Sequence, residues 1–122
     1  MDDRDMKNVL HGIWLCIHRN AIRATTKERI SQFRDSFIDT IENLPCSNCK
    51  NHALEYLRSH PMRENCHVLF YYFTWTWEFH NAVNRRIGKR EMHWQEAYDR
   101  YADGDPYICS KECGNDKKNN RF

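Results

Sequence analysis

The sequence predicts an all-α fold, a four-helix bundle with a short fifth helix and a C-terminal tail. Three observations carry this prediction. Apolar residues recur at spacings of three and four along most of the chain. Residues that start and stop helices separate these stretches. Only 4 of the 122 residues are Gly and 3 are Pro, and short connections favour antiparallel neighbours in a bundle.

The first two helices are predicted from their apolar faces and their ends. Apolar residues at helical spacing predict the first helix over about 8–23. Thr25 or Thr26 can cap the second helix, because a threonine oxygen accepts hydrogen bonds from the free N–H groups of a first turn. The second helix is expected to end before Leu44-Pro45.

Three further helices follow. Pro45 precedes the third helix, whose first turn carries Cys46 to Cys49, and His60-Pro61 stops it. A long fourth helix is predicted from about residue 65 to 86, with Gly88 beyond its last turn. A short fifth helix over about 91–101 closes at Asp103-Gly104.

The predicted helices place one domain over residues 1–104, followed by a flexible tail over residues 105–122. The aromatic stretch 68–77 could instead form a buried β-strand, although the sequence offers it no partner strand. That stretch is shorter than the roughly 18–20 residues of a membrane-spanning helix, so no membrane span is expected. The N-terminus MDDRDMK is acidic, unlike a secretory signal or a mitochondrial transit peptide. A formal charge of +2 is too small to indicate a nucleic-acid partner.

The chemistry of the sequence lies in its 6 cysteines. Cys46 and Cys49 form a Cys-x-x-Cys pair at the start of a predicted helix, where the helix dipole and free N–H groups stabilise a thiolate. Such a pair can act as a redox-active disulfide. The alternative is a zinc site that joins it to Cys109 and Cys113, or to His52, within a zinc-stabilised helical interaction domain. The spacing alone leaves both open.

A redox role would need an electron acceptor. The sequence shows no βαβ unit around the pair, which a thioredoxin fold requires. A flavin bound within the bundle could accept two electrons and pass them to oxygen. Trp14 and His18 share a face of the first helix, and His80 and Asn84 share a face of the fourth, so the bundle offers aromatic and polar contacts. Arg86 and Lys89 follow and could neutralise a diphosphate.

These residues resemble the ERV/ALR family of flavin-linked sulfhydryl oxidases. The stretch HNAVNRRIGK (80–89) is similar to that family's HNxVNxxxGK signature, and WLCIH (14–18) to its WxxxH. LPCSNCKNHA (44–53) resembles the redox pair of the small versions found in large DNA viruses, and YADG (101–104) lies where cellular members have an aromatic residue and Asp-Gly. The order and spacing of the four motifs match from about Val9 to Gly104.

The resemblance implies a helical bundle that cradles FAD, as a homodimer. It implies a thiol oxidase that turns dithiols into disulfides and delivers the electrons to O2, which becomes hydrogen peroxide. Cys49 would face the flavin ring, and Cys46 would exchange with incoming dithiols. By the same resemblance, Cys109 and Cys113 are a possible shuttle disulfide, with structural or intersubunit bonds as alternatives. The implied FAD-binding residues are Trp14, His18, His80, Asn84, Arg86, Lys89 and Tyr101.

The resemblance also suggests partners and a location. Substrates would be thiol-containing proteins, including a thioredoxin-like relay protein, in the host cytoplasm or the virion, with the mitochondrial intermembrane space as the less favoured alternative. The sequence departs from the cellular members at Leu10 and His11, where these often have Gly-Arg. Cys16 is predicted to be buried beside Trp14 as a small apolar residue.

Overall fold

The computed structural model describes the backbone of residues 3–102, with side chains from residue 8 onward, and within this range the chain forms helices but no strand. This confirms the all-α prediction and excludes a strand at 68–77. The helices are α1 (Asp3–Ile22), α2 (Lys27–Glu42), α3 (Ser47–Ser59), α4 (Tyr71–Ile87) and α5 (Trp94–Tyr101).

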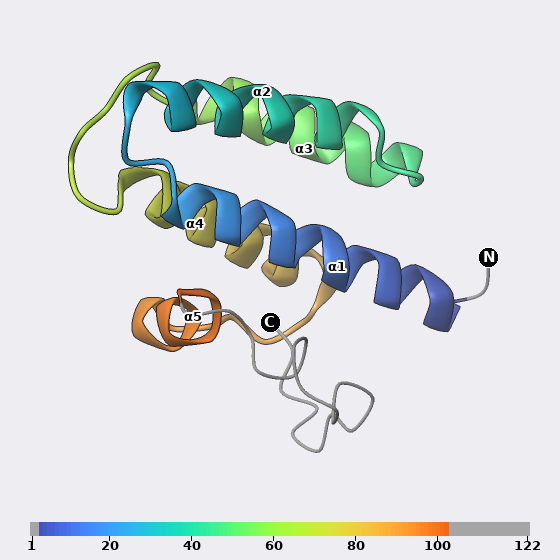
Figure 1. Ribbon diagram of the computed structural model, residues 1–122. Helices are drawn as coiled ribbons and strands as arrows, with labels where there is room; N and C mark the ends of the chain where they lie inside the picture. Colours follow the sequence, from blue (N-terminus) through green and yellow to red (C-terminus); the bar gives the residue numbers. More distant parts are fainter. Residues whose placement is uncertain (1–2, 103–122) are drawn as a thin grey trace.

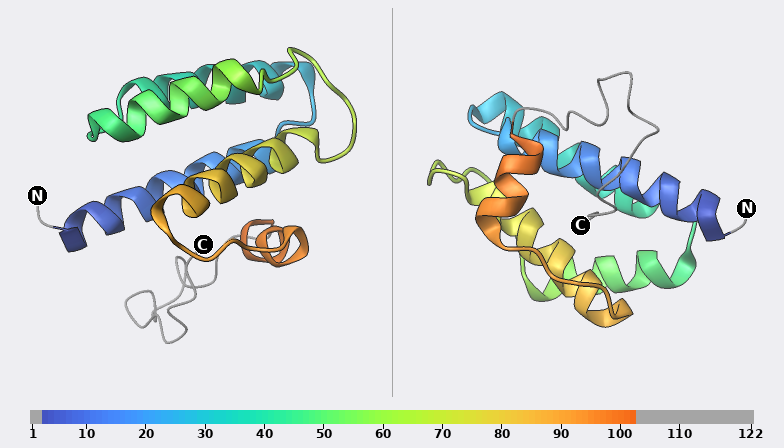
Figure 2. Two further views of the ribbon diagram at one scale, coloured as in Figure 1. Left: turned by 180° about the vertical axis from the view of Figure 1, so that it is seen from behind. Right: turned by 90° about the horizontal axis from the view of Figure 1, so that it is seen from below.

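The helices are arranged in two layers with α5 outside them. Figure 1 shows α2 and α3 side by side in one layer and α1 and α4 in the other, and Figure 2 shows the same from behind. The short helix α5 crosses the outer side of the α1/α4 layer. Arg19 ties α5 to α1, because its Nη1 donates to the carbonyl oxygens of Tyr101 (2.6 Å) and Ala102 (2.8 Å).

Several helix ends follow the predicted signals. The Thr26 side chain caps α2 and accepts a hydrogen bond from the N–H of Arg29 at 3.2 Å. Gly88 ends α4 with φ of 79°, in the left-handed region that glycine enters without a steric cost. After the turn at Gly88, the backbone N–H of Lys89 donates to the backbone carbonyl oxygen of Asn84 at 2.8 Å, which holds Lys89 next to the last turn of α4.

Three predicted helix starts were wrong. Helix α1 begins at Asp3, five residues earlier than predicted. Helix α4 begins at Tyr71 and not near residue 65, because Phe70 has a left-handed backbone (φ 62°) and the Tyr72 hydroxyl accepts from the N–H of Cys66 at 2.9 Å, which holds the preceding segment as a loop.

The third error concerns α5, which begins at Trp94 and not near residue 91. The Asn81 amide binds both backbone groups of Met92: Nδ2 donates to the Met92 oxygen (2.9 Å) and the Met92 N–H donates to Oδ1 (3.0 Å). These bonds use the backbone of the residues before α5 and fix the connection from α4, so the helix starts later.

Large aromatic side chains from different helices fill the centre. Phe37 of α2 meets Trp75 and Phe79 of α4 edge to face, with ring centroids 5.4 and 5.6 Å apart. Cys66 is buried, but Cys16 is exposed, against the prediction. Residues two apart lie about 200° apart around a helix, so Cys16 faces away from the side of α1 that carries Trp14.

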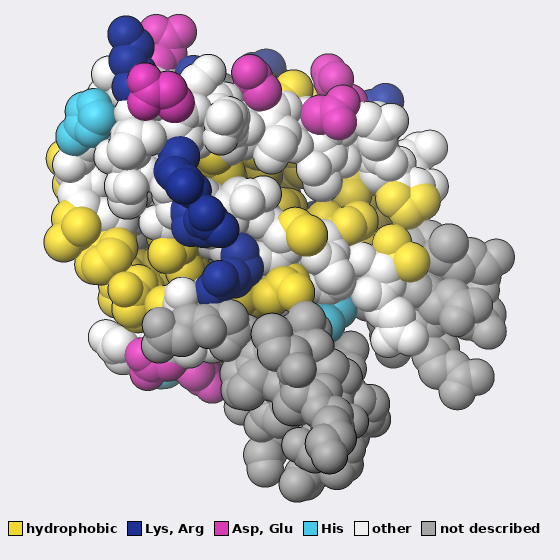
Figure 3. Space-filling model, viewed as in Figure 1, with side chains coloured by type: hydrophobic (Ala, Val, Ile, Leu, Met, Phe, Trp, Pro, Cys, Tyr) yellow, Lys and Arg dark blue, Asp and Glu magenta, His cyan; other side chains and the backbone are white. Residues whose placement is uncertain are grey.

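One face of the described surface is mixed in charge. On the face shown in Figure 3, acidic side chains gather over α2 and a short row of basic side chains lies below them, so neither sign dominates this face. None of the helices among the described residues is both long and apolar enough for a membrane crossing. The tail over 105–122, with Cys109 and Cys113, and the Asp103-Gly104 stop lie outside the described residues.

Candidate functional site

The Cys-x-x-Cys pair lies at the N-terminus of α3, as predicted. Cys46 is the residue that caps the helix, and its Sγ accepts a hydrogen bond from the N–H of Cys49 at 3.2 Å. Both cysteines are free thiols and are partly exposed. A sulfur in this place receives the N–H groups and the positive end of the helix dipole, which favour a thiolate.

The two sulfurs differ in acidity. The hydrogen bonds from the Cys49 thiol and the Cys49 backbone N–H lower the pKa of Cys46, so its thiolate is favoured. Burial raises the pKa of Cys49, and the neighbouring Cys46 sulfur raises it further. In the reduced pair, Cys46 is therefore the sulfur that ionises first.

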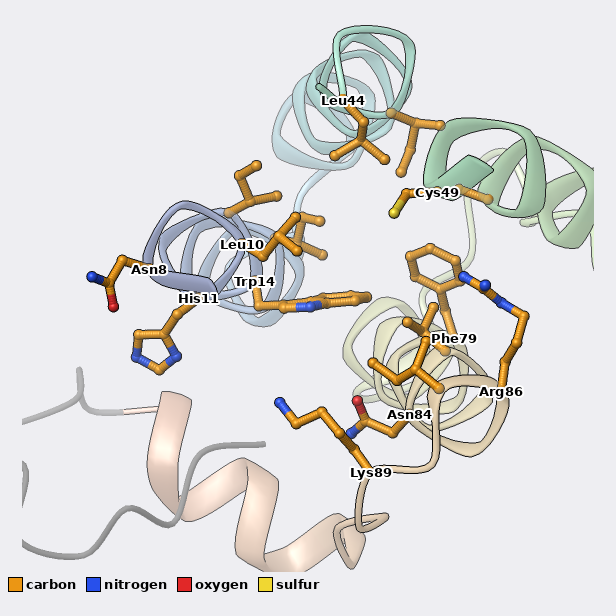
Figure 4. A pocket seen from close by; sticks show the side chains of 16 residues that line it. Asn8, Leu10, His11, Trp14, Leu44, Cys49, Phe79, Asn84, Arg86 and Lys89 are labelled. Carbon is orange, nitrogen blue, oxygen red and sulfur yellow. The ribbon is translucent and has the colours of Figure 1, made fainter. Parts of the chain in front are cut away.

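A cavity of about 740 Å³ opens beside Cys49, between the two helical layers. Figure 4 shows the Cys49 sulfur pointing into it, with the flat face of Trp14 across from it and Phe79 at the side. Pockets for small molecules and cofactors are typically about 300–1,000 Å³, mostly apolar, with a few polar groups. The cavity is lined by Asn8, Leu10, His11, Ile13, Trp14, Ile17, Ile41, Leu44, Cys49, Ala53, Phe79, Val83, Asn84, Arg86, Ile87 and Lys89.

The polar groups of the cavity come mainly from the end of α4. Asn84 is buried, and its side-chain Nδ2 donates to the backbone carbonyl oxygen of Arg90 at 3.2 Å. The side-chain oxygen Oδ1 of Asn84 is then directed toward the cavity. Arg86 and Lys89 add two cationic side chains to the lining. A ligand with an aromatic part and an anionic part would therefore meet complementary groups.

Behind Trp14 lies a buried pair of histidines. The Trp14 indole stacks on the His80 ring, with centroids 3.6 Å apart and planes 5° from parallel. His80 Nδ1 lies 2.8 Å from His18 Nε2, and His18 Nδ1 lies 3.1 Å from the Thr76 hydroxyl oxygen. These contacts join α1 to α4 and hold Trp14 in the cavity wall.

The hydrogen bonds assign the protons on these rings. The Thr76 hydroxyl donates to the carbonyl oxygen of Phe73 at 2.8 Å, so its oxygen is left to accept from His18 Nδ1–H. His18 Nε2 then accepts from His80 Nδ1–H. This arrangement uses neutral His18, and complete burial lowers the pKa of His18 from 6.5 to about 3.

Acid should therefore destabilise the fold through His18. The folded state resists protonation until about pH 3, while the unfolded chain takes up the proton near pH 6.5, so stability falls as pH drops through that window. We expect a loss of about 2 kcal/mol between pH 7 and pH 5 from this group, measured by urea unfolding. His18→Phe should show a smaller loss, and the exposed control His52→Gln should keep the wild-type loss. Equal losses in wild type and His18→Phe would contradict this assignment.

The structure brings part of the predicted site together. Cys49, Trp14, Asn84, Arg86 and Lys89 line one cavity. The other residues that the resemblance implied for the cofactor are fully buried and do not line it: His18, His80 and Tyr101. The His18 ring stacks on the Tyr101 ring at 4.5 Å, so these side chains form a layer behind Trp14.

Sequence reasoning missed most of the apolar wall. Ile17, Phe79 and Val83 line the cavity but were not predicted as lining residues. The available signal was helical spacing, because Leu10 and Ile17 lie four before and three after Trp14 and therefore share its face.

Metal binding receives no support from the described part of the chain. Among the described side chains, from residue 8 to residue 102, no three His, Cys, Asp or Glu groups lie together as a metal site. His52 is therefore not grouped with Cys46 and Cys49 as a set of three ligands in the described part of the chain. The other form of the zinc alternative depends on Cys109 and Cys113, which lie outside the described residues.

A cysteine pair at a helix N-terminus, with Cys49 beside a largely apolar and aromatic cavity, is typical of a helical dithiol–disulfide protein whose cavity could hold an aromatic cofactor. Comparison with known proteins narrows this class. Residues 11–102 match the Erv1/Alr family. The chain belongs to this family, as its motifs predicted.

Viral relatives agree with this membership. Proteins named FAD-linked sulfhydryl oxidase, from African swine fever virus isolates of Kenya, Namibia and Malawi, are each 42% identical to the chain over 59 residues. The matched part is 48% of this chain and 48% of each relative, so the chain spans about half the length of the curated relatives it matches.

Proposed function

We propose that this chain is an FAD-dependent thiol oxidase that forms disulfides in substrate proteins. Two substrate thiols and one O2 would give one disulfide and one hydrogen peroxide. Cys46 and Cys49 form the redox centre, with Cys46 exchanging with the substrate and Cys49 facing the cofactor. Bound FAD would supply the two-electron chemistry that links thiols to oxygen.

The observation that carries the proposal is the direction of the Cys49 sulfur, which points into a cavity of about 740 Å³. Cys46 does not line this cavity, so the two sulfurs have different surroundings. One is placed for a bound cofactor and the other for an incoming thiol.

The residues of the cavity fit FAD. Trp14 and Phe79 offer aromatic surface for the flat rings of the cofactor, and Lys89 offers a cation for its phosphates. The side-chain oxygen Oδ1 of Asn84 can accept a hydrogen bond from a donor on the ring or the ribose of the cofactor. The family membership and the name of the viral relatives, FAD-linked sulfhydryl oxidase, support the same cofactor.

The direct test is the colour and activity of the purified full-length protein. We expect a yellow protein that releases FAD on denaturation, consumes O2 with dithiothreitol and forms hydrogen peroxide. A colourless protein that cannot be loaded with FAD and instead contains stoichiometric zinc would contradict the proposal.

The second cysteine pair suggests how protein substrates reach the redox centre. We propose that Cys109 and Cys113 form a shuttle disulfide that relays electrons from the substrate to Cys46. The double variant Cys109→Ser/Cys113→Ser should then slow oxidation of a reduced protein substrate several-fold more than oxidation of dithiothreitol, because small thiols reach Cys46 directly. An equal effect on both substrates would remove the shuttle role.

The biological setting follows from the same proposal. We propose a homodimer that acts on thiol-containing proteins, with a thioredoxin-like protein as one relay partner. Because the similar proteins belong to a virus, the host cytoplasm or the virion is the favoured location, and the mitochondrial intermembrane space is the second choice. A reducing compartment needs a dedicated source of disulfides.

A further inference from the structure

Two neighbouring arginines, Arg85 and Arg86, lie in the last turn of α4, and they differ in their surroundings. Arg85 pairs with Glu91, with Nη1 and Oε1 2.8 Å apart. Arg86 lines the same cavity as Cys49, and among the described residues it has no ion-pair partner. Figure 4 shows its side chain extending from α4 toward the end of the cavity where the Cys49 sulfur points in.

The second cation of the cavity has a different place. Lys89 lies beyond Asn84 on the other side of the Trp14 ring, and its amino group points away from Arg86 (Figure 4). The sequence assigned Arg86 and Lys89 together to one diphosphate. The structure separates them, with Arg86 near the cysteine end and Lys89 at the far end of the cavity.

We propose that Arg86 serves the cysteine pair, where its guanidinium favours the thiolate of Cys49 after the disulfide opens. This inference rests on the proposed function and adds a positioning residue to it. Arg86 acts through the two sulfurs and needs no direct contact with the substrate.

The chemistry of the exchange gives the charge a role. An incoming thiolate attacks Cys46 Sγ, a new S–S bond forms there, and the Cys46–Cys49 bond breaks with its electron pair leaving on Cys49. The second substrate thiolate then attacks the mixed disulfide and releases Cys46 as a thiolate. The substrate is oxidised and the pair is reduced by the same two electrons.

The departing sulfur is the one that the fold favours less as an anion. Burial raises the pKa of Cys49, whereas Cys46 already has the hydrogen bonds of the helix N-terminus. The positive charge of Arg86 acts in the opposite direction on Cys49 and also favours the Cys46 thiolate. A nearby cation thus offsets part of the cost of placing a thiolate at the cavity wall.

Alkylation of the two cysteines tests the effect of Arg86 on their thiolates without flavin or oxygen. The full-length protein is reduced, treated with iodoacetamide across a range of pH, and digested with trypsin. Cleavage after Arg34 and Lys50 gives a peptide over 35–50 that carries Cys46 and Cys49 and no other cysteine. Fragmentation in the mass spectrometer then gives the rate at each of the two sulfurs.

We expect Arg86→Gln to move the pH midpoint for alkylation of Cys49 upward by about 0.5 unit. The rate of alkylation of Cys49 at neutral pH then falls about threefold. Arg86→Lys keeps the charge and should restore part of the rate. The matched control Arg85→Gln removes a neighbouring charge from the same helix end and should leave the midpoint unchanged.

Two results would overturn the proposal: an unchanged midpoint in Arg86→Gln, or equal shifts in Arg86→Gln and Arg85→Gln. An unchanged midpoint together with a loss of flavin would assign Arg86 to the cofactor. Failure of the thiol oxidase proposal is seen separately, as absence of flavin and oxygen consumption in the wild-type protein.

Discussion

Replacing Cys49 with serine should reduce oxygen consumption with dithiothreitol by at least about 100-fold while bound flavin stays at the wild-type level. Cys49 is the cysteine of the pair whose sulfur lines the cavity. Serine keeps nearly the same size and cannot form a disulfide, so the substrate thiols lose their path to the cofactor. Oxygen consumption and flavin absorbance of the purified protein measure the two quantities.

The control for this variant is Cys16→Ser. Cys16 is exposed and is not part of the cavity lining, so its loss should leave both activity and flavin content unchanged. Normal turnover in Cys49→Ser would remove Cys49 from the mechanism. Loss of flavin from Cys49→Ser would show that the cysteine holds the cofactor, and the activity would then say nothing about electron transfer.

Filling the cavity should prevent cofactor binding. Val83 is a partly buried residue of the lining, and Val83→Trp would place an indole ring in the space of about 740 Å³. We expect the flavin content to fall about tenfold, with a cost in folding stability of about 1–3 kcal/mol from the added bulk. Flavin absorbance after removal of unbound FAD gives the content, and circular dichroism shows whether the helices persist.

The matched control places the same ring elsewhere. Val68 is 65% exposed in the connection between α3 and α4, so Val68→Trp should keep both its flavin and its stability. A folded Val83→Trp protein with full flavin content would show that the cofactor binds outside this cavity.

A helix end could be predicted from the sequence where a nearby residue marks it. A helix start could not be predicted where contacts with residues outside the helix determine it. Thr26 and Gly88 act within one turn of the helix that they end, so spacing and residue type suffice. The start of α4 depends on the Tyr72 hydroxyl and on the left-handed Phe70. Helical spacing continues through 65–70, and so the sequence contained no sign of this break.

The sequence predicted which site residues share a face of one helix, but not how the faces of different helices meet. The spacing of Trp14 and His18, and of His80 and Asn84, placed each pair on a helix face. It could not show that His18 and His80 bind each other at 2.8 Å across 62 residues, which puts them behind the cavity wall. A buried hydrogen bond between two helices depends on how the helices pack, and a single sequence does not contain that packing.

Cys16 shows how adjacency in sequence misleads. It was predicted to be buried because it lies two residues from Trp14, but residues two apart on a helix point to nearly opposite sides. Helix geometry puts Cys16 on a different side of α1 from Trp14, and Cys16 is exposed there. Arg86 shows the reverse case, since it lines the same cavity as Cys49 although the two residues lie on different helices, far apart in the sequence.

The claim that Cys49 links thiols to a flavin in the cavity has one most direct test. Dithiothreitol is added to the purified yellow protein without oxygen, and the flavin absorbance is followed, in wild type and in Cys49→Ser. We predict that the wild-type absorbance bleaches and returns when air is admitted, and that the flavin of Cys49→Ser stays oxidised on the same timescale. Equally fast bleaching in both proteins would contradict the claim.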